Sequence, residues 1–561
     1  MSFGAELFLG LSENLSRNWL PSRIGRIETG DSWAAFRLTR WGSWLLFSWD
    51  SRNYGCGMVQ DEGISFLKKN RDFRSSFGEM LKSSFQNGSF LSVSQENRDR
   101  VLLFRAERIV GAGFPVKLSL VFEGMDRNSN LIVVSEAGTI LEPAKHIHSD
   151  VNRYRTILPG FPYVPPPPVK GVEWASSPKL EGPEDGRKIL GMGRGLASLI
   201  AENWESRSPS AWKESLDGLF GSSPGNGGLL LQKKGDYVTL FPMLLPGTTP
   251  LPGDIASGCG EVLVSSLLAG RKERILSRVR KAIEKEVRSR ERHADGLRHH
   301  LDLAEKGEAY RRSGRLILAS LGSIPARARE VSLADWETGE TVSICLDERL
   351  SAVENAERYF RKFKKGKVDR EDLQRQVESL EAGIVELSEQ LEFLQGLDDP
   401  DLFAAAAYDV LEWLEPRRPE KGRKKKEPAP PHIRVPFQGS EILVGLNARG
   451  NRHVTFRSAS PGDLWFHVHD YPGAHVVVKS SGGECTEETV AVAASLAAWF
   501  SRAKNMGRVW VDYTEKKNVR SVPGSAISLV TYSRPRTIQV SPRQWKEFPE
   551  AALSGALEDR K

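Results

Sequence analysis

The chain has 561 residues, with 79 Lys and Arg against 72 Asp and Glu and a formal net charge of +7. A chain of this length is expected to hold several domains. Its four cysteines lie far apart and form no C-x-x-C pair, which argues against a disulfide framework and a structural zinc site. The first residues do not resemble a signal peptide, and no apolar run reaches the roughly 18 residues of a membrane helix. We therefore expect a soluble, cytoplasmic protein.

The first part of the chain, residues 1–172, is predicted to be rich in antiparallel strands. In AAFRLTRWGSWLLFSW, two apolar runs flank the turn residues Gly42 and Ser43, which is typical of a hairpin. The region ends with four prolines at 165–168. Because proline cannot donate a ladder hydrogen bond, these residues predict a stiff, extended boundary.

The next region, residues 173–262, contains a pattern of the helix-hairpin-helix type. Gly191, Gly193, Ala197 and Ile200 fit G-h-G-x-x-x-A-x-x-I. The glycines allow a tight turn, and the N–H groups at the start of the following helix suit a phosphate. A glycine-rich helix start without any ligand fits the same short pattern, so the sequence leaves both interpretations open.

Residues 263–413 are predicted to form an antiparallel pair of long helices around a small tip module at about 311–367. The returning helix has aliphatic residues at coiled-coil spacing; these are Leu373, Val377, Leu380, Ile384, Leu387, Leu391 and Leu394. The outgoing helix has a less regular seam, with Arg280 and Arg290 at two of its positions. The tip contains the strand-like sequence ETVSICL.

Basic residues gather in the tip and in the following segment. RYFRKFKKGK alternates cations with aromatic residues, a combination that favours RNA because rings stack on bases while Lys and Arg neutralise phosphate. We expect RNA or ribosome contacts here from Arg361, Lys362, Lys364 and Lys365. Charge runs are also common on solvated faces. Residues 414–431, which are rich in Lys, Arg and Pro, are expected to be a flexible linker.

The sequence DLWFHVHDYPGAHVVVK, residues 463–479, predicts two strands joined by a turn. Strand alternation places His467 and His469 on one face, as two metal ligands would be. No further acidic and histidine ligands follow at a hydrolytic spacing, and no nucleophile elbow frames Ser480 or Ser481. A recognition surface is therefore favoured over a metal or catalytic site.

These residues resemble the D-L-W-x-H-x-x-D-x-P-G-(S/A)-H-V signature of the C-terminal domain of NFACT proteins. The flanking ILVGLNARGNRHVTF resembles the strand that enters that domain, and AASLAAWFSRAK resembles its alanine-rich helix. QENRDRV, MDRNSNLIVV and RTILPGFPYVPPPP are similar to motifs of the family's N-terminal part. The resemblance implies an α+β multidomain chain: a β-rich N-terminal NFACT-N domain, the helix-hairpin-helix segment, the coiled coil with its tip, an α/β NFACT-R domain at 432–545, and a tail at 546–561.

The resemblance also implies a function in ribosome-associated quality control. Bacterial members bind a large ribosomal subunit obstructed by peptidyl-tRNA and its nascent chain. They recruit tRNA, expected here to be tRNA-Ala, for template-free C-terminal tailing. The ribosome itself makes the peptide bond, so the resemblance implies no catalytic residue, no metal, no cofactor and no membrane partner.

The family's functional Asp-Arg pair corresponds to Asp99 and Arg100. Arg100 can present two donors to a phosphate or base edge, and Asp99 can hold that guanidinium in place or accept a hydrogen bond from a ribose hydroxyl or base amine. A weak ion pair at a hairpin end is the alternative. The other residues expected to bind tRNA are Lys82, where the family usually has arginine, and Asn130. In the C-terminal domain, RNA or ribosome contacts are expected from Trp465, His467, His469, His475, Lys516 and Lys517.

Two departures from the family and two alternative functions stay open at this point. The chain starts with Ser2, Phe3, Gly4 and Ala5 where the family usually has Ser-Phe-Asp-Gly, so it lacks a carboxylate there, and Lys82 replaces the usual arginine. These departures leave open an altered tRNA choice, reduced tailing, or a nucleic-acid-binding protein without tailing activity. A fibronectin-binding surface adhesin is the other alternative. A DNA glycosylase of the formamidopyrimidine type is disfavoured, because Ser2 stands where those enzymes have a proline nucleophile.

Overall fold

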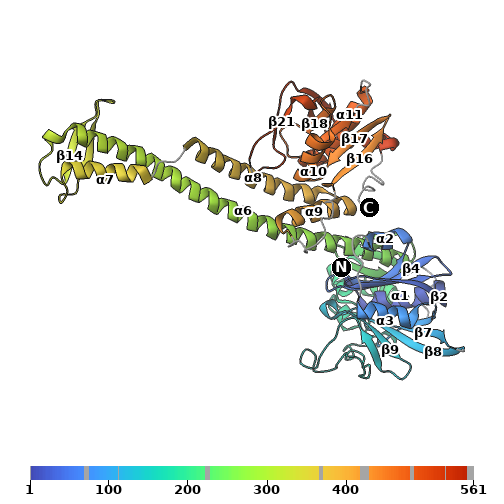
Figure 1. Ribbon diagram of the computed structural model, residues 1–561. Coiled ribbons are helices and arrows are strands. Elements are labelled where there is room, and N and C mark those ends of the chain that lie inside the picture. The colour runs from blue at the N-terminus through green and yellow to red at the C-terminus, as the bar shows by residue number, and fades with distance from the viewer. Residues whose placement is uncertain are drawn as a thin grey trace. The chain divides into compact units, whose positions relative to one another are not determined.

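The computed structural model describes residues 2–68, 75–111, 113–221, 228–365, 370–416, 429–479, 485–524 and 526–551. The chain divides into two compact units, Met1–Glu273 and Arg274–Lys561, whose elements are labelled in Figure 1. The α+β fold class predicted from the sequence is confirmed.

A nine-stranded antiparallel sheet dominates the first unit, in the order β10-β9-β8-β7-β6-β2-β3-β4-β5. Its strands are β2 (Ser22–Thr29), β3 (Trp33–Leu38), β4 (Ser43–Trp49), β5 (Tyr54–Val59), β6 (Ser89–Gln95), β7 (Val101–Val110), β8 (Phe114–Glu123), β9 (Asn130–Ser135) and β10 (Ile140–Pro143). Its helices are α1 (Ala5–Asn18), α2 (Asp61–Lys68) and α3 (Ser76–Phe85). The predicted β3–β4 hairpin is confirmed, and Gly42 adopts the left-handed φ of +67° that its turn requires.

A second, four-stranded sheet joins the start of the chain to the middle region. It has the order β1-β12-β11-β13, and its strands are β1 (Ser2–Phe3), β11 (Leu230–Lys234), β12 (Tyr237–Phe241) and β13 (Thr249–Pro250). The predicted hairpin at residues 191–193 leads into α4 (Arg194–Glu202), which α5 (Pro209–Phe220) follows. Before the hairpin lies only a four-residue 3-10 helix, Asp185–Lys188, so the first helix of the predicted helix-hairpin-helix is no more than one short turn. One apolar cluster contains Phe36, Trp212 and Phe241, so residues 1–172 and 173–262 share a core. The prolines at 165–168 lie outside helix and strand.

The second unit is built on an antiparallel pair of helices, α6 (Ile255–Ala319), of which it contains the part from residue 274 onward, and α8 (Arg370–Gly396). Along the pair, Leu297 of α6 clusters with Val377 of α8, and Ile283 clusters with Leu387, so the two helices run in opposite directions. The predicted seam holds at Leu276 and Ile283, which are buried, but differs at the position between them. Val279 is buried there, whereas Arg280, predicted at the seam, is exposed.

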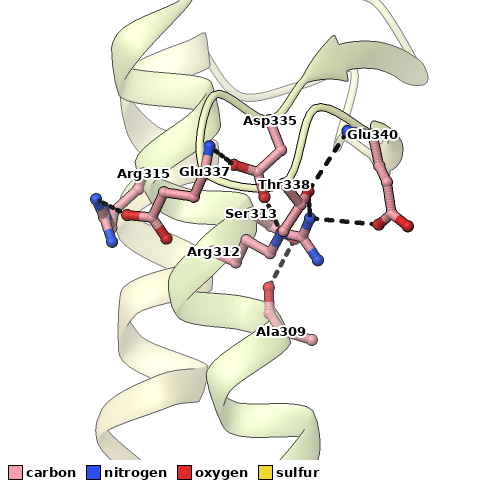
Figure 2. A network of polar contacts seen from close by, with 8 residues as sticks. All are labelled: Ala309, Arg312, Ser313, Arg315, Asp335, Glu337, Thr338 and Glu340. Atoms are coloured by element: carbon pink, nitrogen blue, oxygen red, sulfur yellow. Dashed lines mark hydrogen bonds and ion pairs between the residues drawn. The ribbon is translucent and has the colours of Figure 1, made fainter.

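At its tip, α6 packs against a hairpin of β14 (Glu330–Ala334) and β15 (Thr341–Cys345) and against α7 (Ala352–Lys365). Figure 2 shows how polar contacts hold the hairpin turn to the helix. Arg312 contacts the buried carboxylate of Asp335 and donates to the Thr338 hydroxyl at 2.6 Å, and Arg315 donates to Glu337 at 2.8 Å. The strand predicted from ETVSICL is therefore confirmed as β15.

The C-terminal domain has a six-stranded sheet in the order β16-β17-β19-β18-β20-β23. These strands are β16 (His432–Phe437), β17 (Ser440–Gly445), β18 (Leu464–Val468), β19 (Val476–Lys479), β20 (Val509–Glu515) and β23 (Arg536–Val540). The remaining elements are α9 (Pro400–Leu414), α10 (Ala448–His453), a π-helix (Val454–Ser458), α11 (Glu487–Trp499), β21 (Val519–Ser521) and β22 (Val530–Tyr532). Packing continues past 545, because Phe548 contacts Phe437 and Ala551 is fully buried.

This sheet is covered on both faces. Phe466 and Val468 pack into the core that contains α11, whereas Trp465 and Leu443 pack with Val454 of the π-helix on the opposite face. The expectation that ILVGLNARGNRHVTF continues as a strand is correct only as far as β17. Residues 448–458 are helical instead.

The apolar seam between α6 and α8, the helical pair that we call the stalk, provides a direct stability test. Leu387→Asp places an unpaired charge at a fully buried position of α8, which costs on the order of several kcal/mol. We expect this variant to melt at a clearly lower temperature than the wild type in circular dichroism. Val385→Asp is the matched control, because the Val385 side chain on the same helix is 55% exposed. Equal melting temperatures for the two variants would contradict the pairing described above.

Candidate nucleic-acid interface

Arg100 lies in a tight turn between β6 and β7. Asn97 and Arg98 both have left-handed φ angles, +51° and +49°. The Gln95 side-chain amide closes the turn by donating to the carbonyl oxygens of Asp99 and Ala5, each at 2.9 Å. The turn is therefore fixed both internally and to the start of α1.

The guanidinium of Arg100 is held by residues distant in sequence. Its Nη1 donates to the Tyr54 hydroxyl at 2.9 Å and lies 3.5 Å from Oδ2 of Asp126. Tyr54 is almost fully buried, and burial raises its pKa to about 12, so it stays protonated. The Arg100 side chain is still 27% exposed. The arrangement presents a pre-oriented cation to solvent, suited to a phosphate or base edge.

Asp99 does not hold this guanidinium as the sequence analysis expected. Its Oδ1 instead accepts the backbone N–H of Arg100 at 2.7 Å, so the carboxylate stabilises the turn. Tyr54 and Asp126 take the orienting role. No local sequence signal could have identified Tyr54, because it precedes Arg100 by 46 residues and meets it only through the sheet.

The helix start after Gly193 is already occupied by the protein itself. The Gly193 N–H donates to Oε2 of Glu6 at 2.7 Å, and the Leu196 N–H donates to the Tyr237 hydroxyl at 3.0 Å. Tyr237 and Thr239 in turn donate to Oε1 of Glu6 at 2.6 and 2.7 Å. Glu6 is fully buried, which raises the pKa of its carboxyl. Of the two interpretations of the glycine pattern, the structure therefore supports the one without a phosphate at these two N–H groups.

The same carboxyl explains the absence of a side chain at Gly4. A Cβ at that position would lie 2.2 Å from Oε1 of Glu6 and 2.4 Å from the Tyr237 hydroxyl. Glu6 thus fills the space where an aspartate at position 4 would begin. Because Glu6 is buried and fully hydrogen-bonded, it does not restore a surface carboxylate.

The other two residues expected to bind tRNA differ in accessibility. Lys82, on α3, is 38% exposed and forms an ion pair with Glu79 at 3.2 Å. Asn130 is fully buried. Its side chain donates to the carbonyl of Lys145 at 2.8 Å and accepts the N–H groups of Leu131 and Lys145. Asn130 therefore positions the loop that carries Lys145, and any effect on tRNA is indirect.

At the tip, the predicted cations are exposed but the aromatic residues are not free. Arg361, Lys362 and Lys364 are exposed on α7, whereas the side chain of Lys365 lies outside the described residues. Phe360 packs against Gly314 of α6. The tip can therefore offer cations to phosphates, but Phe360 is already engaged in the module's own packing.

In the C-terminal domain, three of the predicted contact residues form an internal aromatic cluster. Trp465 is fully buried and stacks on His467, with ring centroids 5.8 Å apart and an angle of 11°. His475, 4% exposed, meets the Trp465 ring edge-on at 5.1 Å. Burial lowers the pKa of His467 to about 4 and the pKa of His475 well below its usual value. Both rings are therefore neutral near pH 7, and the cluster shapes the domain rather than presenting charge.

His469 is different, because its imidazole is half exposed and held by a buried carboxylate. Its Nδ1 lies 2.7 Å from Oδ2 of Asp512, and Asp512 also accepts the hydroxyl groups of Tyr532 and Thr537 at 2.8 and 2.7 Å. The hydrogen bond and charge of Asp512 raise the pKa of His469. His469 can therefore carry a positive charge at the surface.

The two predicted lysines of this domain lie at the end of β20. The ammonium of Lys516 lies 5.4 Å from the ring centroid of Phe456, and Lys517 forms an ion pair with Glu515 at 2.5 Å. Within the described ranges, no cluster of three or more His, Cys, Asp or Glu residues could hold a metal. Among the same residues, no helix is both long and apolar enough to cross a membrane.

Comparison with known families agrees with this arrangement. The description "NFACT N-terminal and middle domains" matches residues 9–202 and 262–426, and "NFACT protein RNA binding domain" matches residues 435–531. The chain belongs to the NFACT family. The NFACT resemblance inferred from the sequence is confirmed.

Individual relatives of this NFACT protein have low sequence identity to it, but the similarity extends over most of the chain. It is 27% identical to the Rqc2 homolog RqcH of Streptococcus suis (strain 05ZYH33), covering 84% of this chain and 86% of the relative. It is 28% identical to the Rqc2 homolog RqcH of Bacillus subtilis (strain 168), covering 83% and 85%. A solved structure, the C-terminal part of the fibronectin/fibrinogen-binding protein from Streptococcus suis, is 26% identical, with a TM-score of 0.34, and covers 49% of this chain and 95% of that one.

The His469–Asp512 contact predicts a pH dependence that NMR can measure. We expect Asp512→Asn to lower the pKa of His469, because the raised pKa arises from this carboxylate. The stabilisation it contributes is full below the ordinary imidazole pKa and is lost as pH rises through the raised one. Titration of ¹³C-labelled histidine should show the shift for His469, while His467 stays neutral above pH of about 5. An unchanged pKa of His469 in Asp512→Asn would contradict the contact.

Proposed function

We propose that this NFACT protein is a ribosome-associated quality-control factor that resembles RqcH. In this proposal it acts in the cytoplasm and binds large ribosomal subunits obstructed by peptidyl-tRNA. It recruits tRNA, with tRNA-Ala as the expected species, for template-free C-terminal tailing of the stalled chain. The peptide bond is left to the peptidyl-transferase centre of the ribosome, so the protein itself needs no catalytic residue or cofactor.

The observation that carries this proposal is that the chain matches the NFACT N-terminal and middle domains and, after them in the sequence, the NFACT RNA-binding domain. The similarity to two RqcH proteins over more than four fifths of the chain supports it. The exposed cations of the structure agree with an RNA partner, because phosphate contacts account for much of the affinity of such proteins. These cations include Arg100, Lys362 and His469.

In this proposal Arg100 captures tRNA. Tyr54 and Asp126 fix the guanidinium before RNA arrives, so little side-chain entropy is lost on binding. Asp99 contributes by holding the turn. Gly4 and Lys82 are departures from the family that bear on tRNA choice and on the efficiency of tailing, since neither supplies the usual group.

The Arg100 hypothesis predicts a separation of two RNA partners. The double variant Asp99→Ala/Arg100→Ala should lose co-purified tRNA about ten- to a hundredfold, the usual cost of a bidentate contact. Ribosomal RNA should stay bound, because the helical pair and the C-terminal domain are untouched. Pull-down from cells, with tRNA and ribosomal RNA quantified separately, measures both.

A matched control lies on the same strand. Glu107→Ala/Arg108→Ala also removes an acidic residue followed by an arginine, near the far end of β7, and should leave both RNAs bound. Arg100→Lys keeps the positive charge but loses the planar, bidentate guanidinium, so it should still reduce the amount of co-purified tRNA. Equal loss of both RNAs at an unchanged melting temperature would exclude a specific role in tRNA capture, and unchanged tRNA would exclude Arg100 as a contact.

A further inference from the structure

A helical face in the C-terminal domain carries cations that the sequence analysis did not single out. Residues 448–458 form α10 followed directly by the π-helix. Their spacing places five side chains on one side, at i, i+3, i+4, i+7 and i+8; these are Arg449, Arg452, His453, Phe456 and Arg457. The opposite side is buried, with Ala448, Asn451, Val454 and Thr455 packed into the domain.

This face lines an open groove of about 1010 Å³. Among the residues that the structure describes, ten line the groove, and none of these ten is acidic; they are Trp413, Ala429, Pro430, Arg449, Arg452, His453, Phe456, Arg457, Ser521 and Ile527. Two of them, Trp413 and Phe456, have aromatic rings that are only partly buried. Proteins that bind single-stranded nucleic acid combine cations, which contact the phosphates, with accessible aromatic rings, on which bases stack. The residues that line this groove offer both.

The cations of the groove differ in whether a neighbouring carboxylate compensates their charge. Arg449 forms an ion pair with Asp409 at 3.4 Å, so its charge is largely compensated. Arg452 donates to the Ser521 hydroxyl at 3.2 Å and to the Ile527 carbonyl at 3.1 Å, which are neutral partners. Arg457 is exposed and pairs with no carboxylate among the described residues. Two positive charges therefore remain for a ligand.

Two cations lie near the Phe456 ring: Arg452, which lines the groove, and Lys516, which is not among the lining residues. The guanidinium carbon of Arg452 is 5.8 Å from its centroid, and the ammonium of Lys516 is 5.4 Å away. A base stacked on this ring would have its flanking phosphates within reach of both cations. Burial lowers the pKa of His453, and the neighbouring His432, Arg434 and Arg457 lower it further.

We propose that this groove binds a single-stranded or looped RNA segment, with a base stacked on Phe456 and phosphates held by Arg452, Arg457 and Lys516. This inference rests on the proposed function, because it assumes that the C-terminal domain binds RNA. Beyond that function, it names the surface that binds and the kind of RNA bound there, which is unpaired and not duplex. An A-form duplex keeps its bases stacked inside the helix and leaves no base free for the ring.

The test uses the full chain and a fluorescein-labelled RNA of twelve uridines, with fluorescence anisotropy as the readout. Arg457→Glu should weaken binding by about tenfold or more and reduce its salt dependence, because a phosphate contact is replaced by repulsion. Phe456→Leu keeps an apolar side chain for packing but removes the ring. It should weaken binding by about tenfold with unchanged salt dependence.

Arg508→Glu is the matched control, because Arg508 is an exposed arginine of the same domain that donates to Gln539 and does not line the groove. It should bind the RNA like the wild type. An unlabelled RNA duplex should compete poorly with the labelled strand. If both groove variants bind as well as Arg508→Glu, the groove is not the RNA site. If a labelled polyglutamate peptide, and not the RNA, shows the dependence on Arg457, the groove is a peptide site and the proposal is wrong.

Binding to purified large ribosomal subunits separates this inference from the proposed function. Wild-type binding to subunits, with oligouridine binding indifferent to the groove variants, would overturn the groove and leave the proposed function standing. Oligouridine binding that depends on the groove, without any binding to subunits, would overturn the proposed function and leave the groove as an RNA site.

Discussion

A continuous apolar core joins the helical pair to the C-terminal domain, and the second unit depends on it. The core runs from Val279 and Leu387 of the helices, through Phe403 of α9, to Phe466 of the sheet. A polar clamp reinforces it: the buried carboxylate of Glu386 on α8 accepts the N–H of Ile527 and the N–H and hydroxyl of Ser528, each at 2.6 Å. Ile527 also lines the cationic groove, so the groove and the stalk are positioned together within this unit.

A second constraint is the use of carboxylates inside the protein while several cations stay accessible. Glu6 satisfies Gly193 and its neighbours, and Asp512 satisfies Tyr532, Thr537 and His469. These acids are buried, so they orient polar groups without adding negative charge to the surface. Arg100 is partly compensated by Asp126 at 3.5 Å, whereas Arg457 pairs with no carboxylate among the described residues. The mild net charge of +7 therefore understates how positive the candidate RNA surfaces are.

The sequence predicted features that depend on local periodicity and missed those that depend on contacts across the fold. The stalk follows from aliphatic spacing, although an α-helix drifts from an ideal heptad and buries Val279 in place of Arg280. The internal position of Trp465 and His475 requires a sheet covered on both faces, which alternation along one strand cannot reveal. Tyr54 meets Arg100 only through tertiary structure, and the resemblance that predicted a strand at residues 442–456 gave no sign of the helix that begins at residue 448. The helical spacing of Arg449, Arg452, Phe456 and Arg457 was a usable signal.

The proposed function depends on recognition of an obstructed large ribosomal subunit by this NFACT protein. Sedimentation of the purified protein with large subunits, either vacant or carrying peptidyl-tRNA, tests this recognition most directly. We expect co-migration with the obstructed subunits at low salt, and release as salt rises because phosphate contacts are screened and counterions return. Protein that stays at the top of the gradient at low salt, with obstructed subunits present, would contradict it.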